Sequence, residues 1–140
     1  MTDDVPPGFE LFTRPSPLMD PWRPLYARAE PDRFVLGVYL REPHTNSRAT
    51  AHGGLIAALA DQAMGMSCGV KLRAEGANVA NLWTSSLTID YLGAANVGQW
   101  LAVDTQFSRV GKTLCYAECD VAADGQTIAR GRANFRVSLT

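Results

Sequence analysis

Residues 50–69 constrain the fold of this chain more than any other stretch. After a glycine pair near its start, the stretch consists of good helix formers without proline, and its middle contains only two strongly polar side chains, Asp61 and Gln62. A helix that is apolar nearly all round belongs in an interior. The sequence therefore predicts a long buried helix that begins at Thr50 or at the glycine pair and stops at Gly69.

The carboxylate of Asp61 has unusual neighbours on this helix. Steps of three and four residues place it on one stripe with four small residues, Gly54, Ala58, Gly65 and Cys68. A buried carboxylate costs several kcal/mol unless something compensates for its charge. Small neighbours leave room for another backbone or for a ligand. Asp61 is therefore a candidate functional residue, and the alternatives are a surface position or a pairing with an Arg or Lys elsewhere.

The glycine pair, Gly53 and Gly54, offers backbone N–H groups that no side chain covers. These groups lie at the positive end of the predicted helix dipole. Such a position binds an anion, or an oxygen that becomes negative during a reaction. Glycine pairs also mark ordinary helix entries. Because this pair shares a helix with Asp61, we favour the functional interpretation.

A single helix cannot bring Gly53 and Asp61 to one substrate atom. They are eight positions apart, which is about 12 Å of axial rise. If they cooperate, Asp61 must come from a second copy of the helix that runs antiparallel across a two-fold axis. The stretch therefore predicts a dimer with two composite sites, on the condition that both features are functional.

Charge and cysteine usage exclude several classes of protein. A net charge of -1 over 140 residues argues against a nucleic-acid binder with a broad basic face. No apolar run approaches the ~20 residues of a membrane span, and the first residues do not resemble a signal peptide. Three cysteines without framework spacing predict free buried thiols in the cytoplasm. Two histidines and no cluster of ligands argue against a metal site.

The chain divides into an arm and one domain. Residues 1–32 are rich in proline and predict a mostly irregular arm that covers the core, with at most a helical turn near 22–29. Residues 33–140 form the domain. Outside the helix, alternating apolar residues predict strands at 33–41, 79–92, 97–110, 112–122 and 127–139, the last two joined by a hairpin at Asp124 and Gly125.

One helix among antiparallel strands predicts an α+β fold in which the sheet wraps the helix. The third predicted strand is expected to turn four side chains to one face: Leu101, Val103, Thr105 and Phe107.

These features resemble the hotdog-fold thioesterases, specifically the PaaI-like acyl-CoA thioesterases of the phenylacetate-pathway type. The spacing of Asn46, the triplet at 52–54 and Asp61 carries the resemblance. Supporting segments are Thr84 with 87–92, 108–114 and 133–137. The resemblance implies a hotdog fold, in which a long central helix is wrapped by a curved antiparallel sheet of about five strands.

The resemblance also implies a reaction, the hydrolysis of acyl-CoA to free acid and CoA without a cofactor. The N–H of Gly53 would polarise the thioester carbonyl, and Asp61 of the partner subunit would act as general base or as nucleophile. Asn46 would orient the carbonyl or the attacking water. Thr84 would hydrogen-bond the water or the carboxylate.

Further residues are expected at the substrate. His52 would fix the loop by hydrogen bonds beside Gly54, and Arg109 and Lys112 would either bind CoA phosphates or remain solvated. The implied assembly is a homodimer or a dimer of dimers. Relatives often have a glycine between the Asn and the triplet, where this chain has Arg48 and Ala49.

Two other functions fit a hotdog fold. One is a non-catalytic acyl-CoA-binding or regulatory protein, which would bind acyl-CoA without turning it over. The other is a hydratase or dehydratase, which is disfavoured because such relatives use a catalytic His paired with an acidic residue in a different setting.

Overall fold

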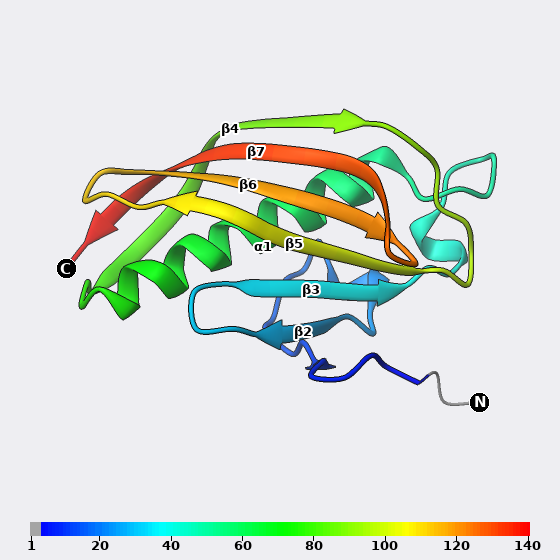
Figure 1. Ribbon diagram of the computed structural model, residues 1–140, viewed down its shortest axis with the longest axis horizontal. Helices are drawn as coiled ribbons and strands as arrows, with labels where there is room; N and C mark the ends of the chain where they lie inside the picture. Colours follow the sequence, from blue (N-terminus) through cyan, green and yellow to red (C-terminus); the bar gives the residue numbers. More distant parts are fainter. Residues whose placement is uncertain (1–3) are drawn as a thin grey trace.

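Helix α1 (Gly53–Ala74) packs against a single seven-stranded antiparallel sheet in the computed structural model, which describes residues 4–140 (Figure 1). In spatial order the strands are β1 (Glu10–Leu11), β2 (Tyr26–Ala29), β3 (Phe34–Tyr39), β5 (Trp100–Arg109), β6 (Leu114–Ala123), β7 (Gln126–Leu139) and β4 (Val79–Tyr91). Two short 3-10 turns are also present: η1 (Asp20–Trp22) lies between β1 and β2, and η2 (Glu42–His44) lies between β3 and α1. The expected α+β hotdog arrangement is confirmed, with two more strands than the five predicted.

Helix α1 is longer than the sequence pattern predicts. It begins at Gly53 and continues through Gly69 to Ala74, so the predicted stop at Gly69 is wrong. Gly69 is buried, and a Cβ at this position would lie 3.5 Å from the Leu82 side chain. A methyl group would meet Leu82 at an ordinary contact distance, so Gly69 is an interior helix residue and not the end of the helix. Among the described residues 4–140, no helix has the length and apolarity that a membrane span requires.

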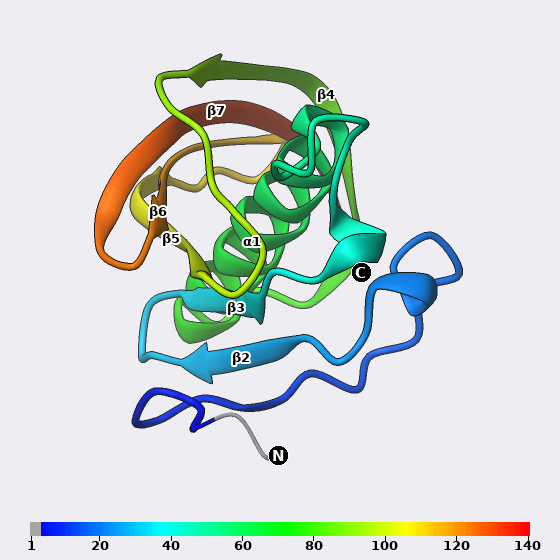
Figure 2. The same cartoon turned by 90° about the vertical axis from the view of Figure 1, so that its right-hand side faces the viewer.

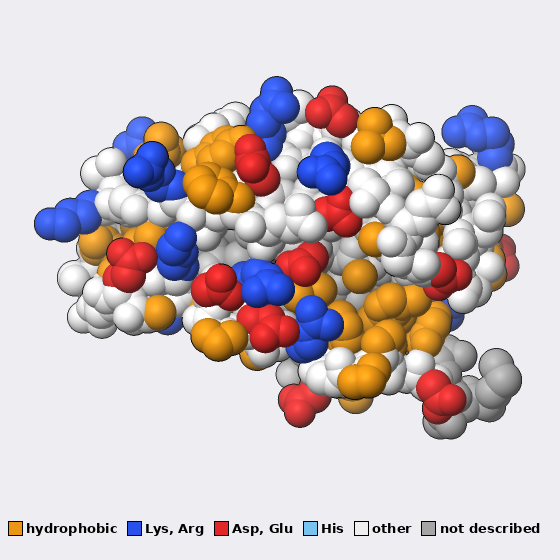
Figure 3. All heavy atoms as spheres, in the orientation of Figure 1, with side chains coloured by type: hydrophobic (Ala, Val, Ile, Leu, Met, Phe, Trp, Pro, Cys, Tyr) orange, Lys and Arg blue, Asp and Glu red, His pale blue; other side chains and the backbone are white. Residues whose placement is uncertain are grey.

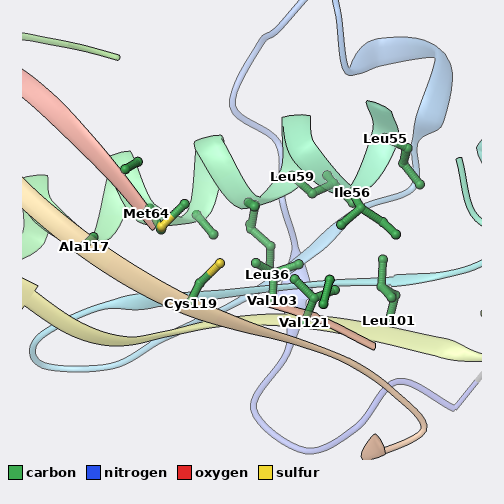
Figure 4. Close-up of a cluster of buried hydrophobic side chains, with 14 of the residues drawn as sticks. Leu36, Leu55, Ile56, Leu59, Met64, Leu101, Val103, Ala117, Cys119 and Val121 are labelled. Atoms are coloured by element: carbon green, nitrogen blue, oxygen red, sulfur yellow. The ribbon is translucent and has the colours of Figure 1, made fainter. Parts of the chain in front are cut away.

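The side of α1 that faces the sheet forms the centre of the core (Figure 4). Leu59 and Met64 on the helix are fully buried, as are Leu101 and Val121 on the strands. Burying one such side chain contributes about 1.5–3 kcal/mol. The three free cysteines, Cys68, Cys115 and Cys119, are buried in the same core, as predicted.

A bulge in β5 changes which side chains face the core. Leu101, Val103 and Thr105 are buried, but the register of β5 against β6 shifts between Thr105 and Phe107. An extra residue in one strand turns the following side chains to the opposite face. Phe107 is 50% exposed and lies 6.3 Å, centroid to centroid, from the ring of Tyr116. The prediction that Phe107 shares the inward face is therefore wrong.

The N-terminal arm contributes to both the sheet and the core. β1 pairs with β2 and β2 with β3, so residues 26–29 form a strand, and the helical turn expected near them lies just upstream at Asp20–Trp22. Phe12, Met19 and Leu25 are buried, which confirms that the arm covers the core.

The outer face of the sheet is charged but of mixed sign. Arg or Lys side chains alternate with Asp or Glu over β5, β6 and β7 (Figure 3). Arg130, for example, lies 3.9 Å from Asp120 on the neighbouring strand. Interspersed charges of both signs give this face no strong field of one sign.

Trp100 fastens the arm to the sheet. Its ring centroid lies 5.1 Å from that of Phe9, 5.9 Å from Tyr26 and 4.7 Å from Tyr39. The indole lies directly over Gly37 on β3, where an added Cβ would come within 2.1 Å of Trp100 Cζ2. Gly37 therefore creates the space that the ring occupies.

Gly37→Ala should lower the free energy of unfolding by about 1–3 kcal/mol, because the new methyl group would displace the Trp100 ring. Urea denaturation at constant m-value measures the change. Gly93→Ala is the matched control, since a Cβ at Gly93 meets Ile128 only at 3.6 Å. The control should stay within about 0.5 kcal/mol of the parent, and equal losses in the two variants would contradict the packing argument.

Candidate active site

Figure 2 shows that the sheet leaves one side of α1 uncovered, between β4 and the arm. Residues of α1, β4 and the arm line an open cleft of about 530 Å³ there. Asp61 on α1 and Thr84 on β4 both line it, and Thr84 Oγ1 donates a 2.5 Å hydrogen bond to Asp61 Oδ1. Asp61 is half-buried and Thr84 is exposed. The structure thus brings these two predicted residues together, with the carboxylate open to a ligand in the cleft.

The side chain of His52 caps the start of α1. Its Nδ1 accepts a 2.8 Å hydrogen bond from the N–H of Gly54, a typical N-cap interaction. Within the described residues 4–140, the N–H of Gly53 has no acceptor. Only one N–H of the predicted pair is therefore free to bind a substrate oxygen. The helix is continuous from Gly53 to Asp61, which keeps these residues about 12 Å apart within one chain.

Tyr91 holds the end of β4 to the start of α1, a contact that the sequence analysis missed. Its hydroxyl donates a 2.6 Å hydrogen bond to the carbonyl of Gly53. Partial burial raises the pKa of Tyr91, so the hydroxyl keeps its proton at neutral pH. Tyr91 is therefore a positioning residue for Gly53.

Asn46 is engaged within its own loop. Its Oδ1 accepts hydrogen bonds from the N–H of Arg48 at 2.9 Å and from that of Thr50 at 3.3 Å, while Nδ2 donates to Thr50 Oγ1 at 3.1 Å. This is the Asx turn common for Asn in loops. Ala49 takes a φ of 60°, a backbone conformation that favours glycine. In this structure Asn46 shapes the loop, and its catalytic role stays a prediction.

Hydrogen bonds of the buried His44 hold the loop that contains Asn46. It is 1% exposed, its Nδ1 accepts from the N–H of Arg41 at 2.9 Å, and its Nε2 lies 2.8 Å from the carbonyl of Trp22. Because a backbone N–H can only donate, Nδ1 is the unprotonated nitrogen and Nε2 is the donor. The His44 carbonyl in turn accepts from the N–H of His52 at 2.9 Å. Burial lowers the pKa of His44.

Arg109 and Lys112 lie outside the cleft. Both are exposed, at the hairpin between β5 and β6. Lys71 near the end of α1 donates a 2.7 Å hydrogen bond to the Ser108 carbonyl, which fixes this hairpin at the far end of the helix. Lys71 is ten residues beyond Asp61, or about 15 Å along the helix axis. Within one chain, the two cations are therefore separate from the carboxylate.

Comparison with known proteins identifies the family of this chain. Residues 49–129 match the family model described as the thioesterase superfamily. A Pseudomonas aeruginosa protein named "Putative esterase PA0474" is 31% identical over 135 residues, which are 96% of this chain and 98% of that protein. Acyl-coenzyme A thioesterase 13 of Mus musculus is 32% identical over 108 residues, which are 74% of this chain and 72% of that protein.

Solved structures share the fold at lower identity. The Streptococcus mutans protein smu.793, bound to acetyl CoA, has a TM-score of 0.71 at 19% identity and aligns over 99% of this chain and 94% of its own. The E. coli PaaI protein from the phenylacetic acid degradation operon has a TM-score of 0.68 at 19% identity, over 81% and 79% of the two chains. Fold and site together define a thioester hydrolase. The chain belongs to the thioesterase superfamily.

Acidification should destabilise the protein through His44. Because the pKa of the folded state lies below the ordinary value of 6.5, the unfolded chain binds more protons between the two values. The His44 contribution is therefore complete above about pH 6.5 and declines as the pH falls, by at most about 1.4 kcal/mol per pH unit.

NMR titration of the two imidazoles checks this directly, with His52→Asn to assign the signals because Asn also caps helices well. Urea denaturation of the parent and of His44→Gln between pH 7.5 and 5 should show a steeper loss for the parent. A His44 signal that titrates at or above 6.5 would contradict the argument.

Proposed function

We propose that this protein hydrolyses acyl-CoA thioesters to a free acid and CoA, in sites that two subunits of a homodimer or of a dimer of dimers build together. The observation that carries the proposal is the Asp61 carboxylate, which lines an open cleft and accepts a hydrogen bond from Thr84. The helix that contains Asp61 begins at Gly53, whose N–H has no acceptor among residues 4–140. The name of the mouse relative and the acetyl CoA in the smu.793 structure support CoA thioesters as substrates. Three buried free thiols fit a reducing cytoplasm, where we place the reaction.

In the proposed mechanism, the N–H of Gly53 binds the thioester carbonyl oxygen and stabilises the negative charge that develops on it. Asp61 of the partner subunit either takes a proton from the attacking water or attacks the carbonyl carbon itself, giving an anhydride that water then opens. In both routes the C–S bond breaks and CoA leaves as a thiolate that takes up a proton. Thr84 orients the carboxylate through its hydrogen bond.

The two edges of the sheet support a dimer through β4. One edge, β1, is two residues long, whereas the other, β4, has thirteen residues and exposes Trp83 and Leu87. A long edge strand with apolar side chains is an open template for pairing. We propose that a second copy pairs with β4, which sets the two α1 helices antiparallel and carries each Asp61 to the other subunit's Gly53.

The same arrangement gives Arg109 and Lys112 a role. Antiparallel helices bring the C-terminal end of one α1 toward the N-terminal loop of the other. The hairpin at that end would then approach a CoA molecule bound at the partner's helix start, where its two cations would meet the phosphates.

Asp61→Asn should lower kcat by about 10²–10⁴, the usual contribution of a general base, while the dimer persists in size-exclusion chromatography with light scattering. Free-thiol detection with a panel of acyl-CoAs measures turnover. Thr84→Val, which removes the hydroxyl but keeps the shape, should lose less than Asp61→Asn. Full activity of Asp61→Asn would remove Asp61 from the mechanism, and acyl-CoA binding without turnover by the parent would indicate a binding protein.

Gly53→Pro should remove the proposed oxyanion donor without disturbing the helix. Proline is well tolerated at the first helical position, and the preceding His52, at φ -67° and ψ 134°, already has the conformation that proline requires. The expected loss in kcat is about 10²–10³. Gly53→Ala keeps the N–H and is the control, since its Cβ would meet Tyr91 only at 3.4 Å.

Mixing the two defects tests whether the site is shared. The test uses a heterodimer of one Asp61→Asn chain and one Gly53→Pro chain, purified by two different tags. If the sites are shared, one site of this heterodimer has both groups intact and the other has neither. Such a heterodimer should recover about half of the parent activity if the groups come from different subunits. If each site used one chain only, both sites would stay defective.

A further inference from the structure

The cleft that contains Asp61 also contains two arginines. Arg14 from the arm and Arg73 from the last turn of α1 both line it. The Arg73 side chain folds back along the helix, so that its Nη1 lies 3.0 Å from the position that a Cβ of Gly69 would take. Gly69 is eight residues beyond Asp61, which places this guanidinium about 12 Å from the carboxylate along the helix axis.

Neither guanidinium is neutralised by a described residue. Arg28 and Arg33 form ion pairs with Glu30 and Asp104, but the side chains of Arg14 and Arg73 have no hydrogen bond or ion pair among residues 4–140. Of the described residues that line the cleft, Asp61 alone is acidic. The cleft therefore has one negative group, at the proposed reaction centre, and two positive groups, of which Arg73 lies about 12 Å from the carboxylate along the helix axis.

Apolar and polar side chains share the rest of the lining. Phe34, Met66, Leu82 and Phe135 are its large apolar members, and Gln62 and Asn81 are polar. Gly65 leaves space beside Phe135, because a Cβ there would come within 3.2 Å of the Phe135 ring. Large apolar side chains and two cations in one cleft suit a hydrocarbon chain that ends in an anion.

We propose that the preferred substrates carry a carboxylate at the far end of the acyl chain, and that Arg14 and Arg73 bind this carboxylate. The inference rests on the acyl-CoA hydrolysis proposed above and names its substrate class, the CoA thioesters of dicarboxylic acids. The planar guanidinium matches a carboxylate with two parallel hydrogen bonds. The second carboxylate takes no part in the reaction, and the products are a free dicarboxylic acid and CoA.

Suberoyl-CoA and octanoyl-CoA test the proposal, because they share an eight-carbon chain and differ in the terminal carboxylate. The parent should hydrolyse suberoyl-CoA with the higher kcat/KM. Arg14→Gln and Arg73→Gln should each lower that value by about 10- to 100-fold, the effect expected for a lost hydrogen bond to a charged group, and should change octanoyl-CoA hydrolysis by less than about threefold. Arg132→Gln, an exposed arginine on β7 outside the cleft, is the control and should change neither substrate.

Pantetheine thioesters of the same two acids separate the acyl carboxylate from the CoA phosphates. The preference for suberoyl and its loss in the two variants should persist without the phosphates. If the variants instead lose both CoA substrates equally and neither pantetheine thioester, the arginines bind phosphate and the inference is wrong. Equal hydrolysis of all substrates by all variants would overturn this inference and leave the proposed function intact, whereas no hydrolysis of any acyl-CoA by the parent would overturn both.

Discussion

The packing of α1 against the sheet is the interaction on which the site depends. Leu59, Met64 and the other inward side chains are removed from water on one side of the helix, while the opposite side faces the cleft with Asp61. A helix held along its whole length cannot shift one end without disturbing the other. The same apolar contacts therefore place both Asp61 and Gly53, which Thr84 and Tyr91 then hold by hydrogen bonds.

The sequence pattern was informative where periodicity reports burial directly. Alternating apolar residues predicted β3 to β7 to within a few residues, and the apolar run predicted α1. The errors have physical causes that the pattern does not contain. The β5 bulge turns Phe107 outward, and Gly69 packs against Leu82 where a helix stop was expected. Tyr91 bonds to Gly53 across 38 positions, and a contact between such distant residues leaves no local signal.

The candidate site also shows which residues the sequence alone could and could not predict. Asp61 and Gly53 stand out in the sequence because a carboxylate and an open N–H are unusual on an apolar helix. Thr84 became a candidate only through the family resemblance, and the fold then placed its hydroxyl against Asp61. His52, Gly54 and Asn46 belong to the same motif, but capping and substrate binding use the same polar atoms. Only coordinates show that the N–H of Gly54 is bonded to His52 while that of Gly53 is not.

Charge separation along the cleft connects the proposed chemistry with the proposed selectivity. Two carboxylates 4 Å apart repel by about 1 kcal/mol in bulk water and by more where water is partly excluded, so an anionic acyl group next to Asp61 would bind poorly. The apolar side chains of the cleft, with Arg14 and Arg73, offer such a group a place away from Asp61, and at Arg73 this place lies about two helical turns along α1. A substrate with its thioester at Asp61 and its second carboxylate at the arginines pairs that carboxylate with opposite charge and keeps it away from Asp61. A substrate bound in the reverse sense would leave the arginines unpaired and place like charges together.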